Sequence, residues 1–227
     1  MSSDPSPLSF PGEDGASASH PEGGGPLLRL LARGLELWLR QQCDSIGQLE
    51  IQLSGSAAAL LLGRLEGVSL AARRVVYRQL EFEAVDLRSD PIRVRMGPLL
   101  RSQGVQLDHP FRIRGQVAFS GDGLNRSLAA SEWRSLGDGL AEQLLGLTPL
   151  RSLEIDGDRL LLSVCGVASE EPIRIAAHLG AADGTVEVRG IDGGPTIRLP
   201  MDPNVRIERA ELGQGRLQLE GEARVSP

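Results

Sequence analysis

The chain of 227 residues contains no lysine, since all 24 of its basic residues are arginines. Phosphate binding by a P-loop, Schiff-base chemistry and phosphoryl transfer by protein kinases each require a lysine amine. The sequence therefore excludes these classes of enzyme. Aromatic residues make up only 3% of the chain, too few for base stacking, and the net charge of −6 also argues against a nucleic-acid partner.

Cysteine is scarce, and long hydrophobic runs are absent. The two cysteines, Cys43 and Cys165, are far apart in the chain, so we expect free thiols in a reducing compartment rather than a disulfide framework. The sequence has no run of about 18 uncharged apolar residues, and its N-terminus lacks a charged region followed by an apolar run. We expect a cytoplasmic protein, with at most peripheral contact at the cytoplasmic face of a membrane.

Residues with catalytic or metal-binding chemistry are not grouped in the sequence. The three histidines lie far apart and lack the spacing of metal ligands. Neither a Gly-x-Ser-x-Gly elbow nor a Gly-x-Gly-x-x-Gly loop occurs. Asp156 and Asp158 flank Gly157, but an Asp-Gly pair between alternating segments indicates a hairpin turn. We therefore expect no enzyme activity, no metal and no cofactor.

The dominant pattern that is present is an alternation of apolar and polar residues with a period of two. It is clearest in residues 111–119 and 216–225. Because side chains on a strand point to opposite faces in turn, each such segment predicts a strand with one apolar face. Further strands are predicted at 49–53, 66–73, 80–88, 91–96, 153–155, 160–164, 173–179, 186–188 and 205–212. Short turns between them favour antiparallel neighbours.

The first helical segment covers residues 27–43 and follows a tail, residues 1–26, that we expect to be disordered because it is rich in Ser, Pro, Gly and acids. Pro26 suits the first turn of a helix. One polar stripe is formed by Arg29, Arg33, Glu36 and Arg40. Apolar residues cover most of the remaining circumference, so we expect this helix to be enclosed by a sheet or to lie on a membrane.

A second amphipathic helix is predicted at about residues 131–146, where large apolar residues recur at helical spacing. Ser120 is a good N-cap for the turns that precede it. Residues 57–62 form an apolar run too short to classify, and residues 98–102 indicate a turn or short helix. Residues 64–114 hold ten arginines against six acidic residues, a balance that favours contact with anionic lipid or simply a solvated strand face.

Four segments, taken in order, resemble the LmeA-like phospholipid-binding proteins of bacteria. They are Leu37-Trp38-Leu39-Arg40-Gln41-Gln42, the run from Gly63 to Leu80, the piece Leu124-Asn125-x-Ser127-Leu128 after Ser120, and Glu211-Leu212-Gly213 followed by Leu217-x-Leu219-x-Gly221. The similarity covers residues 27–227. It implies one lipid-binding domain of the α+β class, in which a curved antiparallel sheet wraps one long helix beside a second amphipathic helix. It implies no catalytic residues.

The resemblance also implies an apolar groove for a phospholipid or another acyl-chain lipid. The candidate groove residues are Leu31, Leu35, Trp38, Leu39, Phe82, Phe111, Ile113, Phe119, Leu136, Leu140 and Leu144. The candidate headgroup residues are Arg93, Arg95, Arg112 and Arg114. Core packing for the first set and a solvated face for the second are the competing interpretations. Two functions follow as hypotheses: non-enzymatic phospholipid binding or transfer, and a structural or assembly module that binds a protein partner.

Overall fold

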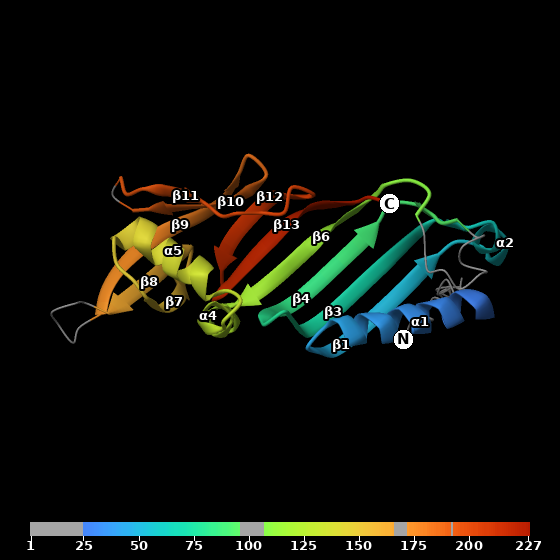
Figure 1. Ribbon diagram of the computed structural model, residues 1–227, viewed down its shortest axis with the longest axis horizontal. Helices are drawn as coiled ribbons and strands as arrows, with labels where there is room; N and C mark the ends of the chain where they lie inside the picture. Colours follow the sequence, from blue (N-terminus) through green and yellow to red (C-terminus); the bar gives the residue numbers. More distant parts are fainter. Residues whose placement is uncertain (1–24, 96–106, 166–171, 192) are drawn as a thin grey trace, which may run out of the picture.

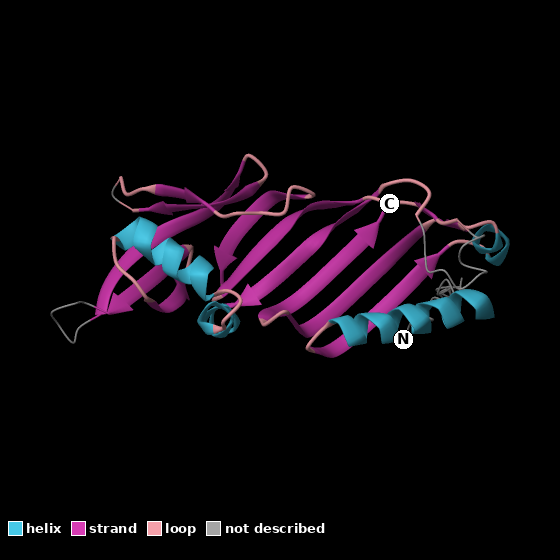
Figure 2. Cartoon of the chain, viewed as in Figure 1, coloured by secondary structure: helices cyan, strands magenta, loops and turns pink. Residues whose placement is uncertain are grey.

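The computed structural model describes residues 25–95, 107–165, 172–191 and 193–227. Two antiparallel sheets follow one another along the long axis of an elongated molecule (Figure 1). Strands dominate, and the helices lie along the edge of the larger sheet, at its outer end, at the junction of the two sheets and over the smaller sheet (Figure 2). This architecture agrees with the predicted α+β class.

The larger sheet has six strands. In spatial order they are β1 (Ser45–Ser54), β3 (Gly67–Tyr77), β4 (Leu80–Ser89), β6 (Phe111–Ser120), β13 (Arg216–Val225) and β12 (Val205–Gly213). The helix α1 (Pro26–Gln42) lies along its edge strand β1. At one end of the molecule, the short helix α2 (Ala57–Leu61) lies beside a two-stranded ribbon of β2 (Arg64–Leu65) and β5 (Ile92–Arg93).

The smaller sheet has five strands and carries the main core. Its strands in spatial order are β11 (Thr196–Arg198), β10 (Thr185–Gly190), β9 (Pro172–Ala182), β8 (Arg159–Cys165) and β7 (Leu150–Asp156). The helix α5 (Arg134–Leu145) packs across it. The buried core residues are Leu140, Leu144, Leu153, Leu160, Leu162, Ala177, Val188 and Ile197. Each large aliphatic side chain buried here contributes about 1.5–3 kcal/mol of transfer free energy.

The helix α4 (Gly121–Ala129) joins the two sheets. The Asn125 side chain donates to the carbonyl of Leu153 in β7 and accepts from the backbone N–H of Leu153 at 2.6 Å. The Ser127 hydroxyl accepts from the backbone N–H of Glu81 in β4 at 2.9 Å. Two side chains of one short helix therefore tie the two sheets together, which gives a structural role to part of the Leu124-Asn125-x-Ser127-Leu128 piece.

Most elements predicted from periodicity are confirmed. Pro26 begins α1, and the Ser120 hydroxyl caps α4 by accepting from the backbone N–H of Gly123 at 3.1 Å. The apolar run 57–62 forms α2. The second helix begins later than predicted, because Trp133 is its N-cap residue and its indole N–H donates to the Arg78 carbonyl at 2.7 Å.

Three expectations need qualification. The strand predicted over 91–96 is reduced to the two residues of β5, followed by an isolated bridge from Val94. The segment 98–102 and nearly all of the predicted tail lie outside the described residues. A long helix wrapped by one sheet is not confirmed, because α1 lies along an edge strand and α5 covers a separate sheet.

Candidate lipid-binding surface

The larger sheet has one continuous apolar face. Residues that are direct partners in neighbouring strands share a face, so the register identifies rows that cross the whole sheet. One row is Leu49, Ala72, Val85, Val117, Leu219 and Ala210. The next is Ile51, Leu70, Leu87, Gly115, Gly221 and Ile207. The row between them is polar or small and belongs to the opposite face: Glu50, Ala71, Asp86, Gln116, Glu220 and Arg209.

This apolar face is covered at one end and open at the other. At the β12 end, Ile207 and Ala210 are buried and pack with Val186 of the smaller sheet. At the β1 end, Leu49 and Ile51 remain partly exposed. The smaller sheet therefore completes the core at β12. In β1, β3 and β4, Ala72 and Val75 are buried, whereas the larger aliphatic side chains of the two rows, Leu49, Ile51, Leu70, Val85 and Leu87, are only partly covered.

The helix α1 covers part of the open end. The polar side chains of β1, such as Glu50 and Gln52, are exposed, so α1 packs over the apolar side of that strand. Leu28 is buried, and Leu35 and Leu39 are partly buried. The other apolar side of the helix carries the exposed residues Leu30, Leu31, Leu37 and Trp38. The helix thus presents apolar side chains both to the sheet and to the surroundings.

The structure brings together the aromatic and aliphatic candidates from the sheet. Phe111, Ile113 and Phe119 alternate along β6 on the apolar face, opposite Val225, Ala223 and Leu217 of β13. Phe82 of β4 packs against Phe119, with ring centroids 4.8 Å apart. These four candidates share one face of the larger sheet, on the side where α1 packs.

The candidates from the second helix lie elsewhere. Leu140 and Leu144 are buried in the core of the smaller sheet, and Leu136 is partly buried on the same helix. The structure therefore corrects the expectation that both helices border one groove, because α1 and α5 belong to different sheets. Periodicity identified the packing face of α5 but not the sheet that it covers.

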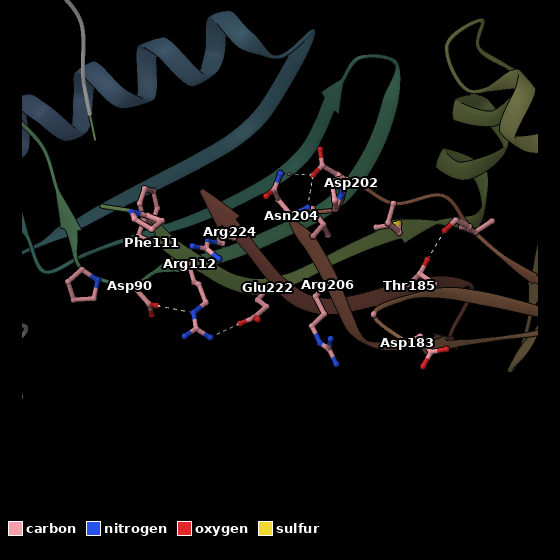
Figure 3. A pocket seen from close by; sticks show the side chains of 17 residues that line it. Asp90, Phe111, Arg112, Asp183, Thr185, Asp202, Asn204, Arg206, Glu222 and Arg224 are labelled. Carbon is pink, nitrogen blue, oxygen red and sulfur yellow. Dashed lines mark hydrogen bonds and ion pairs between the residues drawn. The ribbon is translucent and has the colours of Figure 1, made fainter. Parts of the chain in front are cut away.

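The four candidate headgroup arginines are divided between two places. Arg112 and Arg114 lie on the polar face, and each has a guanidinium within 4.0 Å of carboxylates of both Asp90 and Glu222. Figure 3 shows Arg112 between these two carboxylates, in a cleft of about 1070 Å³ between the two sheets. Their charges are already balanced by acidic partners, on the face opposite the aliphatic rows.

Arg93 and Arg95 lie at the α2 end of the molecule. Arg95 pairs with Asp108 at 3.3 Å. Arg93 is the direct partner of Arg64 in the β2–β5 ribbon. Arg64, Leu61 and Leu62 lie at the same end of the molecule but were not among the candidate residues predicted from the sequence. Leu61 and Leu62 end the apolar run 57–62, which was too short to classify.

The described part of the chain provides no group of three or more His, Cys, Asp or Glu residues that is placed to hold a metal ion. Burial raises the pKa of the Cys43 thiol above 9.0, with the neighbouring Asp44 adding to the shift, so this thiol is neutral and a poor nucleophile near pH 7. Among the same residues, no helix has both the length and the apolar character needed to cross a bilayer.

An apolar sheet face that the protein leaves partly uncovered, beside a helix with exposed leucines, marks a binding surface for an apolar ligand, a membrane or a protein partner. More specifically, the chain belongs to the LmeA-like phospholipid-binding family, whose model matches residues 23–222. No curated protein and no solved structure matches the chain. The family assignment agrees with the resemblance found in the sequence.

Proposed function

We propose that this protein binds phospholipid without catalysing a reaction and holds acyl chains against the open apolar face of the larger sheet. The observation that carries this proposal is the change in coverage across that face. Ile207 of β12 is buried. Ile51 of β1 and Leu70 of β3 lie in the same row but are partly exposed. Acyl chains would cover the aliphatic side chains that the protein itself leaves partly uncovered.

The energy available from such contact is sufficient for stable binding. Burial of one methylene group contributes about 0.8 kcal/mol, so about a dozen methylenes contribute roughly 10 kcal/mol before association costs. Leu35 and Leu39 of α1, which are partly buried, would close the site from the edge of the sheet. The membership in a phospholipid-binding family supports this ligand class.

The test compares two neighbouring residues of β1 that lie on opposite faces. We expect Ile51→Asp to reduce retained phospholipid at least about tenfold, because it places a charge against the acyl chains. The matched control is Gln52→Asp, which places the same charge on the polar face and should retain lipid like the wild type. Native mass spectrometry of the purified proteins, followed by denaturing lipid extraction, measures the retained lipid, and circular dichroism checks the fold.

The proposal fails if the wild-type protein carries no lipid and also takes up no fluorescent acyl-chain probe. Equal lipid retention by folded Ile51→Asp and Gln52→Asp would also contradict it, because the apolar face would then not be the site. In either case the exposed Leu37 and Trp38 of α1 would favour the second hypothesis, a module that binds a protein partner.

A further inference from the structure

The end of the molecule that carries α2 exposes two adjacent large hydrophobic side chains. Leu61 is 65% exposed and Leu62 is 71% exposed. The helix α2 lies against α1, whose first half contributes the exposed residues Leu30 and Leu31. Single exposed leucines are common on protein surfaces, but a concentration of them at one end of a molecule marks an interaction site.

The same end carries a pair of like charges in direct opposition. Arg64 and Arg93 are partners in the antiparallel β2–β5 ribbon, so their side chains lie on the same face. Neither guanidinium has a carboxylate within 4.0 Å among the residues that the structure describes. Like charges directly opposite each other destabilise a ribbon. An anion between them would relieve this repulsion, and each guanidinium can donate two hydrogen bonds to one phosphate group.

We propose that this end, the α2 tip formed by Leu61, Leu62, Arg64 and Arg93, docks onto a bilayer that contains anionic phospholipid. The inference rests on the proposed function, because it names the membrane from which the bound lipid would come. Leu61 and Leu62 enter the boundary between headgroups and acyl chains, and the two arginines contact lipid phosphates. A protein of net charge −6 needs such a local basic site to approach an anionic surface.

The position of the tip suits lipid exchange with the sheet. The tip lies at one extreme of the long axis (Figure 1). The strand β1 ends at Ser54, shortly before α2 begins at Ala57. Leu53 of β1 and its partner Val68 of β3 therefore form the row of the open apolar face nearest to the tip. A lipid that leaves the bilayer at the tip would first contact the aliphatic side chains of this row.

Flotation of the full chain with vesicles tests the docking. The two probes are vesicles of phosphatidylcholine alone and vesicles that also contain phosphatidylglycerol. We expect the wild-type protein to bind the second kind, and we expect added salt to weaken this binding. A wild-type protein that ignores both kinds, or that binds both equally, would overturn the proposal.

Paired substitutions separate the two contributions. Arg64→Gln combined with Arg93→Gln should weaken binding to anionic vesicles roughly 25-fold. Leu61→Ser combined with Leu62→Ser should weaken it at least about tenfold. The controls remove equivalent exposed side chains of the smaller sheet and its surroundings: Arg151→Gln with Arg174→Gln, and Ile173→Ser with Met201→Ser. If the tip variants bind anionic vesicles as strongly as the control variants do, the proposal is overturned.

Lipid retention, measured on the same preparations, distinguishes failure of the tip from failure of the proposed function. A protein that retains lipid but does not bind vesicles overturns only the proposal that the α2 tip docks onto a bilayer. A protein that docks through the α2 tip, but neither retains lipid nor takes up the fluorescent acyl-chain probe, supports docking by the tip and contradicts the acyl-chain site. Thermal unfolding of each variant confirms that the fold is unchanged, which is expected because all four tip side chains are exposed.

Discussion

The Ser127 hydroxyl group is fully buried and makes two hydrogen bonds at the junction of the sheets. It accepts from the backbone N–H of Glu81 and donates to the carbonyl of Gly123 at 2.7 Å. We expect Ser127→Ala to lower the free energy of unfolding by about 1–3 kcal/mol, because it leaves the part-buried N–H of Glu81 and the Gly123 carbonyl without this partner. Urea unfolding measures the effect. The exposed Ser131→Ala serves as control, and equal stability of the two variants would contradict the role assigned to Ser127.

A second residue of α4 links stability to pH. Arg126 donates to both carboxylate oxygens of Glu81, at 2.8 and 2.6 Å. These hydrogen bonds, with the attraction of the charges, hold the pKa of Glu81 below its ordinary value of 4.5, although partial burial opposes the shift. Because the folded-state pKa is lowered, the stabilisation is present above pH 4.5 and is lost as the pH falls through the lowered pKa.

We therefore expect Arg126→Gln to destabilise the protein at pH 7 and to have little effect at a pH below that lowered pKa. Urea unfolding at a series of pH values measures the difference. Arg134→Gln is the matched control, since Arg134 is exposed and its guanidinium donates only to the Ala129 carbonyl among the described contacts. A destabilisation by Arg126→Gln that stays constant across the pH series would show that the ion pair is not its cause.

Single residues could be predicted only where their partners are close in the sequence. Ser120 was identified as an N-cap because it bonds the backbone N–H three residues later. Ser127 and Asn125 were noticed as part of a pattern, but their roles could not be inferred. Their partners are 46 and 28 positions away, and only the tertiary fold brings them together.

Two glycines allow close contact between strands of the larger sheet. A Cβ atom at Gly115 would collide with the backbone of Asp86 and with Leu87, and one at Gly221 would collide with the backbone of Arg206. We expect Gly115→Ala to cost about 1–3 kcal/mol of stability through this overlap. Gly180→Ala in β9 meets no atom within 4 Å and should leave stability unchanged or slightly raised. Thermal unfolding compares the two, and similar melting temperatures would contradict the close approach.

The elements themselves were largely predictable, whereas their grouping was not. Alternation with period two identifies a strand and its apolar face, and helical spacing identifies α1 and α5. These periods do not indicate which strands pair with one another. They therefore could not predict that β7 to β11 form a separate sheet, or that α5 packs on that sheet. The short strand β11 was missed because three residues, Thr196–Arg198, are too few to show a period.

For the whole molecule, the class and the family were predicted correctly, but the enclosure of one long helix by one sheet is not confirmed. The prediction placed one long helix inside one sheet. The structure places the core in the smaller sheet and leaves part of the apolar face of the larger sheet open. Pattern analysis cannot distinguish a filled core from an open face, because both require the same aliphatic residues in the same alternation.

Under the proposed function, the uneven cover of the larger sheet would make the stability of the protein depend on its supply of lipid. A ligand that binds only the folded state stabilises it by RT ln(1 + [L]/Kd). Lipid on the open face would act as the missing part of the hydrophobic core, so chains without lipid would unfold locally at β1 and β3 and become substrates for proteolysis. The cellular lifetime of the protein would then follow the amount of lipid that it carries, and empty copies would be removed first.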